Sequence, residues 1–239
     1  MIAAAPALLA GAVPAAAQWG TENALARPGF AFPADRPVRI VMFRPDVQVG
    51  AQSTGGIDQP DADWTATARV NIARALADAW SAPAIRLIDM PDPADAADAA
   101  LLADYRALFR TVARTVFEAR LFAGNRLPTK KARFDWTLGP GVARLGALGG
   151  GDYGLFVYSY DSYGSRGRKA AQIVGLMTGV GLTSGTHVGY AGLVDLTTGD
   201  LVWINADVSM GGDVRRADGA ARRVAQLLQG FPARAGAAR

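Results

Sequence analysis

The 239-residue sequence has no cysteine, a single histidine and only two glutamates. Without cysteine there are no disulfides, no thiolate catalysis and no cysteine-ligated zinc or iron–sulfur cluster, and we expect no lipoprotein anchor. A nucleophilic triad would need His187 as its base, and no G-x-S-x-G turn accompanies it. With Glu22 and Glu118 alone, a glycosidase-type pair of carboxylates would have to come from aspartates.

The excess of one sign of charge over the other is also small. The net charge is +4 and no five or six like charges follow one another. This balance favours anionic partners such as headgroups, peptidoglycan carboxylates or nucleic acid without selecting one. Arg166, Arg168 and Lys169 form one of the densest basic groups, and we take them as candidate partner-binding residues. They adjoin the uncharged, glycine-rich segment 170–185, which is too short to span a bilayer. A solvated loop remains the simpler interpretation of these basic residues.

The N-terminal segment resembles an export signal. Residues 1–17 are apolar and uncharged, and they end in three alanines before Gln18, as a signal-peptidase site does. No lysine or arginine precedes the apolar run, so we expect that a basic region lies upstream. A leader that stays uncleaved on a cytoplasmic protein is the alternative.

Hydrophobic periodicity predicts one α/β domain over residues 37–232. A linker (18–36) is expected before it and a disordered tail (233–239) after it. Strands are predicted at 38–43, 84–89, 153–160, 187–196 and 201–207. Helices are predicted at 64–80, 101–122, 142–148, 165–177 and 218–229. Asp63 is the expected cap of the first helix, and Gly50–Asp63 is expected to be a polar loop. Alternation of strands and helices, followed by a late antiparallel hairpin, indicates a single mixed β-sheet with helices packed against it.

No motif in the sequence identifies a catalytic or metal-binding site. Asp195 and Asp207 flank the late hairpin and could approach each other across it, but no spacing matches a known metal loop. The glycines at 179–185 and the 164–169 segment miss the spacings of dinucleotide- and phosphate-binding loops. We therefore predict no catalytic residue, no metal and no cofactor.

The C-terminal third resembles a group of bacterial envelope domains. The matching residues are Asp152–Val157, Gly192–Trp203 with its V-D-L-T-T-G-D-L-V-W hairpin, Gly212–Arg215, Leu227–Leu228 and Phe231–Pro232. They are similar to the periplasmic part of the curli-secretion lipoprotein, to lipoprotein activators of penicillin-binding proteins, and to the N-terminal domain of the Tol–Pal propeller protein. The resemblance implies a protein that acts through contact and assembly rather than catalysis.

These observations together predict a non-enzymatic exported protein of the periplasm or outer membrane. It would bind an envelope protein, peptidoglycan or an outer-membrane component, or form a homo-oligomer. Two alternatives remain open, a hydrolase using aspartates and His187, and a nucleotide- or nucleic-acid-binding module using the basic loops.

Overall fold

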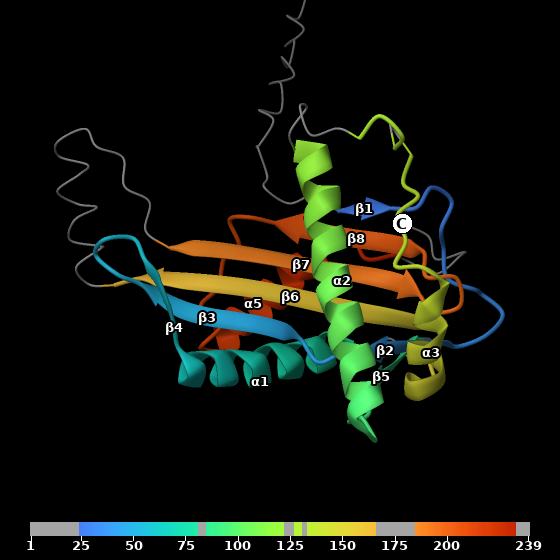
Figure 1. Cartoon of the computed structure of the whole chain (residues 1–239), viewed down its shortest axis with the longest axis horizontal. Coiled ribbons are helices and arrows are strands. Elements are labelled where there is room, and N and C mark those ends of the chain that lie inside the picture. The colour runs from blue at the N-terminus through green and yellow to red at the C-terminus, as the bar shows by residue number, and fades with distance from the viewer. Residues whose placement is uncertain (1–23, 81–84, 122–126, 131–132, 166–184, 233–239) are drawn as a thin grey trace, which may run out of the picture.

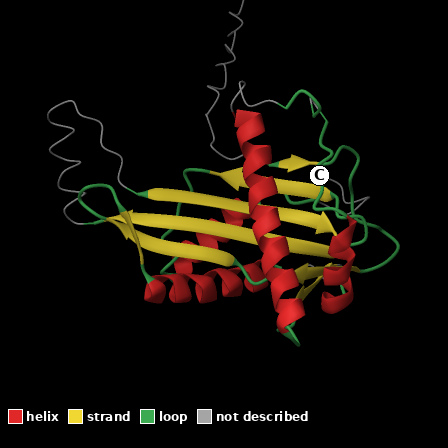
Figure 2. Cartoon of the chain, viewed as in Figure 1, coloured by secondary structure: helices red, strands yellow, loops and turns green. Residues whose placement is uncertain are grey.

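A computed structural model describes residues 24–80, 85–121, 127–130, 133–165 and 185–232. The strands are β1 (Leu25–Ala26), β2 (Val38–Met42), β3 (Asp46–Gln52), β4 (Asp58–Pro60), β5 (Ile85–Asp89), β6 (Tyr153–Gly164), β7 (Thr186–Asp195) and β8 (Leu201–Asp207). The helices are α1 (Ala62–Ala79), α2 (Ala96–Leu121), α3 (Ala143–Gly149), which follows a 3-10 turn at Pro140–Val142, and α5 (Ala217–Leu227). Figure 2 shows the helices packed around a single sheet.

The sheet is mixed, which confirms the predicted fold class. Its order is β1-β8-β7-β6-β2-β5, with β3 beside β6 and β4 beside β3. Strand β2 is parallel to both β5 and β6, whereas the β6–β7 and β7–β8 pairs are antiparallel. The predicted late hairpin is therefore present, and Gly199 gives its turn the required positive φ of 84°.

Apolar side chains on the two faces of the sheet build two cores. Helices α1 and α5 cover one face, where Ile72, Leu76 and Trp203 are buried. Helices α2 and α3 cover the other face, and α2 crosses the strands (Figure 1). There Phe109 of α2 stacks on Phe156, which in turn stacks on Phe43. Because the long strands are buried on both faces, they contain short unbroken apolar runs, such as Leu155–Val157 and Leu201–Ile204.

The first helix begins two residues earlier than expected, at Ala62. Asp61, not Asp63, is the N-cap, and its Oδ1 accepts a hydrogen bond from the Trp64 backbone N–H at 2.9 Å. Both aspartates suit a cap by residue type. Strand β4 ends at Pro60, so the helix can start at once.

The stretch expected to be a polar loop carries strands. Strand β3 runs along β6 from Asp46 to Gln52, and β4 pairs with its end. Val47 and Val49 are buried while Gln48 is exposed, which is the alternation of a half-buried strand. A side chain at Gly50 would collide with the Gln59 carbonyl, so the glycine allows the two strands to approach.

Part of the predicted linker belongs to the packed domain. From residue 24 onward, β1 pairs with β8 and Phe32 is completely buried against Tyr153. The proposed leader, the helix predicted at 165–177 and the C-terminal tail fall wholly or mostly outside the described residues. Among the helices that are described, none combines the length and apolar character needed to cross a membrane.

Candidate functional site

The edge of the sheet has a gap where β5 ends at Asp89 and where the chain passes from the end of β2 at Met42 to the start of β3 at Asp46. We call this gap the notch. The last β2–β5 backbone bond runs from the Met90 N–H to the Met42 carbonyl at 2.9 Å. Pro45 has no N–H to continue a ladder, and the chain gains one residue relative to β6 between Met42 and Asp46. From Asp46 to Val49 strand β3 pairs with β6 alone, so the sheet loses a strand at this point.

The notch lies at a topological switch point of the sheet. The path from β2 to β5 runs through α1 on one face, and the path from β5 to β6 runs through α2 on the other. In open α/β sheets, ligands bind outside the carboxyl ends of strands at such a place. Here a pocket of about 490 Å³ occupies the position, between α1 and α2. This volume suits a small molecule.

Much of the pocket lining is apolar and includes two flexible methionine side chains. The apolar part of the lining includes Met42, Phe43, Met90, Pro91, Pro93 and Leu102. Methionine side chains adapt their shape to different apolar ligands. The described lining residues include no serine, threonine, histidine, lysine or tyrosine. They therefore provide apolar surface, guanidinium groups and two carboxylates, but no hydroxyl, amine or imidazole nucleophile.

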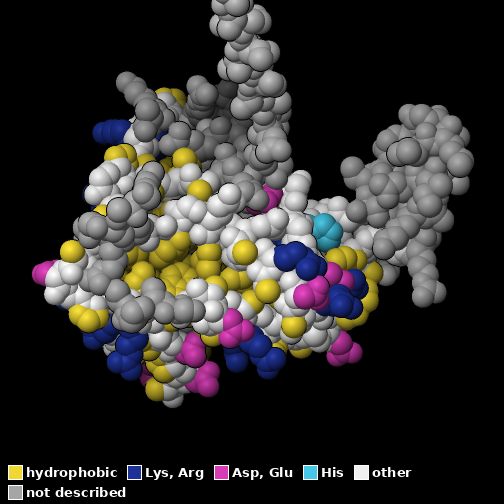
Figure 3. All heavy atoms as spheres, turned by 180° about the vertical axis from the view of Figure 1, so that it is seen from behind, with side chains coloured by type: hydrophobic (Ala, Val, Ile, Leu, Met, Phe, Trp, Pro, Cys, Tyr) yellow, Lys and Arg dark blue, Asp and Glu magenta, His cyan; other side chains and the backbone are white. Residues whose placement is uncertain are grey.

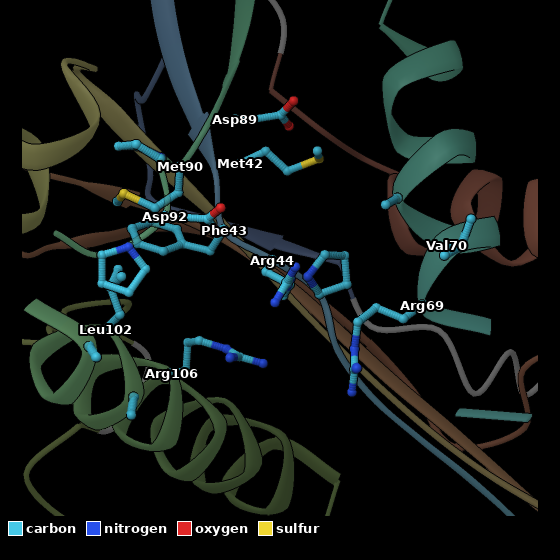
Figure 4. Close-up of a pocket in the computed structure, with 16 residues that line it drawn as sticks. Met42, Phe43, Arg44, Arg69, Val70, Asp89, Met90, Asp92, Leu102 and Arg106 are labelled. Carbon is cyan, nitrogen blue, oxygen red and sulfur yellow. The ribbon is translucent and has the colours of Figure 1, made fainter. Parts of the chain in front are cut away.

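Three arginines line one side of the pocket. Arg44 follows β2, Arg69 extends from α1 and Arg106 from α2, and Figure 4 shows them together on that side. The carboxylate that neutralises this region is Asp46, which accepts from Arg110 at 3.0 Å and lies 3.8 Å from Arg106. The guanidinium groups thus outnumber the carboxylate, and a partly enclosed site with excess positive charge attracts anions.

Two of these arginines have unused buried donors. The Nε atoms of Arg69 and Arg106 are shielded from solvent and have no hydrogen-bond partner among the described residues. Arg69 makes one long bond, from Nη2 to the Val47 carbonyl at 3.4 Å. A buried donor without a partner costs about 1–3 kcal/mol, so an acceptor supplied by a ligand would recover that free energy.

Two carboxylates lie toward the other side of the pocket. Asp89 ends β5 and Asp92 precedes α2, and both line the pocket. Figure 4 shows Asp89 on the far side of Met42 from the arginines, and Asp92 beside Phe43. The pocket is therefore polarised from the arginines toward Asp89, with apolar side chains along the way.

A second polar cluster lies between α5 and the face of the sheet that α5 covers, around Arg223. Its guanidinium binds Asp161 in a bidentate pair, with Nη2–Oδ1 at 2.7 Å and Nη1–Oδ2 at 2.9 Å. It also donates to Ser159 Oγ and to the carbonyls of Gly211 and Gly212. Arg223 and Asp161 are both completely buried. We call Arg223, Asp161, Ser159 and His187 the buried network.

Hydrogen bonding keeps the buried carboxylate ionised. Burial raises the pKa of Asp161, but hydrogen bonds from His187 and Arg223 outweigh burial and leave that pKa below its ordinary value. His187 Nδ1 lies 2.7 Å from Asp161 Oδ1. Ser159 Oγ donates to Asp161 Oδ2 at 2.9 Å. The carboxylate is therefore surrounded by donors, which is a structural ion-pair arrangement.

The arrangement of these groups does not support the hydrolase interpretation. Ser159 Oγ bonds to Asp161 and Arg223 and is linked to no histidine by a described bond, as a nucleophile in a triad would be. The expectation that Asp195 and Asp207 approach each other was wrong. In the sheet register Asp195 lies opposite Tyr153 and Asp207 opposite Gly189, at the two ends of the β7–β8 hairpin.

Both hairpin aspartates have local structural roles. Asp195 Oδ1 accepts the backbone N–H groups of Thr197 and Thr198 and so shapes the turn. Asp207 Oδ1 accepts from the Ser209 N–H at 2.7 Å. No group of three histidine or acidic residues suited to a metal ion occurs in the described part of the chain.

The predicted partner-binding residues Arg166, Arg168 and Lys169 lie outside the described residues, so they remain a prediction. On the face that α1 and α5 cover, acidic and basic side chains are intermixed (Figure 3). Sequence reasoning missed the notch, whose residues come from β2, α1, the end of β5 and α2. The available signal was the pair of parallel strands, because the carboxyl ends of parallel strands mark binding sites.

Comparisons with known proteins find only distant structural likenesses. No protein-family model matches the chain, and no curated protein matches it in sequence. The structure is similar to a PelC dodecamer from Paraburkholderia phytofirmans, with 13% identity, a TM-score of 0.39 and coverage of 90% of this chain and 99% of that one. It is also similar to lipoprotein GNA1162 from Neisseria meningitidis, with 16% identity, a TM-score of 0.30 and coverage of 72% and 80%. Neither is one of the three families named from the sequence, and these values place the chain in no family.

Proposed function

We propose that this protein is a non-catalytic binding protein of the cell envelope, and that it holds a small anionic ligand in the notch pocket. The observation that carries the proposal is the pair of unpartnered buried Nε donors on Arg69 and Arg106, at the edge of a pocket of ligand size. A carboxylate or phosphate accepts guanidinium donors in a planar, bidentate geometry.

The composition of the pocket supports binding rather than turnover. Its charged groups are arginines, which stay protonated, and solvated aspartates, which hold no described base or nucleophile in place. The apolar lining adds affinity for a ligand with a hydrophobic part, at about 25 cal/mol for each Å² buried. An anion joined to an apolar body fits both features.

Titration of the purified full chain with octanoate, followed by calorimetry and NMR, tests the binding proposal. Saturable binding that weakens with added salt is expected, because screening reduces the attraction between charges. The Arg69→Gln/Arg106→Gln double variant should bind at least tenfold more weakly, since charge-assisted hydrogen bonds contribute about 1.5–3 kcal/mol each. Arg114→Gln is the matched control, because Arg114 lies on α2 outside the pocket and pairs with Glu118.

A steric variant tests the location independently of charge. Ala103 lines the pocket from an exposed position on α2, so Ala103→Trp should fill the space and abolish octanoate binding without loss of the fold. Ala107→Trp, one turn later and also exposed, does not line the pocket and should bind normally. Equal binding by both tryptophan variants would remove the notch as the site.

Action in the envelope is supported by the leader-like segment 1–17 and its small-residue site before Gln18. Fractionation of the native host with N-terminal sequencing tests it, and a periplasmic product that begins at Gln18 is expected. A cytoplasmic product that retains residues 1–17 would contradict the envelope part of the proposal and leave the pocket proposal intact. Assembly into a homo-oligomer and contact through Arg166, Arg168 and Lys169 remain predictions within the same proposal.

A further inference from the structure

We propose that the ligand of the notch pocket is zwitterionic, with an anionic group held by the arginines and a protonated amine held by Asp89 and Asp92. This inference rests on the proposed function, since it names the chemical class of ligand for the same pocket. An amine and a carboxylate at the two ends of an apolar spacer, as in an ω-amino acid or a short apolar peptide, have this chemistry.

The first step is the separation of charge across the pocket. Arg44, Arg69 and Arg106 come from β2, α1 and α2, whereas Asp89 and Asp92 come from the end of β5 and the segment that follows it. Figure 4 shows Asp89 on the far side of Met42 from the three labelled arginines, and Asp92 beside Phe43. No described ion pair joins the two sides. A ligand with one sign of charge would therefore leave one side of the pocket without a counterpart.

The second step is the contrast with other carboxylates near the notch. Asp46 is held by Arg106 and Arg110, and Asp95 is held at the start of α2, where it accepts the Asp98 N–H at 2.9 Å. The carboxylates of Asp89 and Asp92 have no described hydrogen bond or ion pair, yet both residues line the pocket. They are the acceptors that remain for a ligand, and a protonated amine supplies up to three donors.

The third step is the apolar surface between the charges. Met42 lies between the arginines and Asp89, and Phe43, Met90 and Leu102 add to the apolar lining. A spacer of methylene groups or an apolar side chain can bury against these residues. Because methionine is flexible, spacers of somewhat different length should be accepted.

The test compares three probes that share one alkyl chain: octanoate, octanoate with an amine at its far end, and octylammonium. In calorimetric titrations of the full chain, the zwitterion should bind about three- to fivefold more tightly than octanoate, the upper part of the range expected for one exposed ion pair. Octylammonium should bind most weakly, since it leaves the arginines without a partner. Each titration is repeated at higher salt, where the preference should shrink.

Variants assign the amine to its site. In Asp89→Asn/Asp92→Asn the zwitterion should lose its advantage, while octanoate should bind as well as before or better. Both residues are exposed, so the double variant should fold. Asp63→Asn/Asp78→Asn changes net charge equally at exposed positions of α1 that do not line the pocket, and it should keep the preference.

The outcomes separate this inference from the proposal on which it rests. Equal affinity for octanoate and the zwitterion in the wild-type chain would overturn the inference and leave anion binding in place. A preference for the zwitterion that survives in Asp89→Asn/Asp92→Asn would also overturn it, because the amine would then bind elsewhere. Failure of all three probes to bind would overturn both proposals.

Discussion

The buried network and the notch both contain arginines with buried guanidinium atoms, but they use these atoms differently. In the network, the Nε and both Nη atoms of Arg223 have acceptors: Asp161, Ser159 and two backbone carbonyls. In the notch, Arg69 and Arg106 keep Nε atoms that have no described acceptor. The fold supplies acceptors to every nitrogen of the Arg223 guanidinium, whereas Arg69 and Arg106 each keep one N–H donor that the described fold does not use.

This difference distinguishes a structural polar group from a binding group. A buried ion pair adds little net stability over apolar residues, but loss of one partner is costly because a charge remains buried alone. An arginine with an orphan donor already carries part of that cost, so its removal should cost the fold little. The comparison predicts that replacing arginine with methionine destabilises the fold strongly in the buried network and only slightly in the notch.

The largest effect is expected from Arg223→Met. The substitution leaves Asp161 buried without its bidentate partner, so the free energy of unfolding should fall by about 3–5 kcal/mol. Urea unfolding followed by circular dichroism measures the change. Arg222→Met on the same helix removes an exposed pair with Asp218 and should change stability by less than about 1 kcal/mol. A loss of similar size in both variants would end the distinction.

Ser159→Ala should have a smaller effect on the same network. The hydroxyl accepts from Arg223 Nη1 at 2.8 Å and donates to Asp161, so its loss should cost about 1.5–3 kcal/mol. In a double-mutant cycle, the Ser159→Ala and Arg223→Met losses should not add, since the two residues share a hydrogen bond. Additive losses would show that serine contributes independently of the arginine.

Acid should weaken the network side of the molecule gradually. Hydrogen bonds from the Arg215 side chain lower the pKa of Asp213, which follows the Arg223-bound carbonyls, to about 2. A carboxylate with a lowered pKa stabilises the fold above its unfolded pKa of about 3.9, and that contribution is lost as pH falls through the folded value. Unfolding free energy should therefore fall between about pH 4 and about pH 2, and fall less in Asp213→Asn. An identical acid profile for the variant would contradict this role.

The smallest effect on stability is expected from Arg69→Met/Arg106→Met in the notch. Removal of the two unpartnered Nε donors should offset the weak contacts that are lost, so unfolding free energy should change by less than about 1 kcal/mol while octanoate binding is lost. Urea unfolding and calorimetry on the same preparation measure both effects. A loss as large as that of Arg223→Met would mean that these arginines support the fold instead.

The sequence by itself determined most of the secondary structure. The apolar stripes with a period near 3.6 located α1 and α2, and aromatic and β-branched runs located β6, β7 and β8. The turn at Gly199 followed from the need for a positive φ. These features depend on residues close together in the chain, so local patterns are sufficient to find them. Strand β3 was missed because proline and glycine usually interrupt strands, whereas here Pro45 directly precedes the strand and Gly50 lies within it.

Only the tertiary structure decided where the charged residues meet. Arg223 and Asp161 lie 62 positions apart in the chain, and Arg69 and Arg106 belong to helices on opposite faces of the sheet. Aspartate and arginine are common on surfaces, so their positions in the sequence do not distinguish a solvated charge from a buried or a pocket-lining one. Strand order and crossover direction, which depend on contacts between distant segments, placed one set beneath α5 and opened the notch for the other.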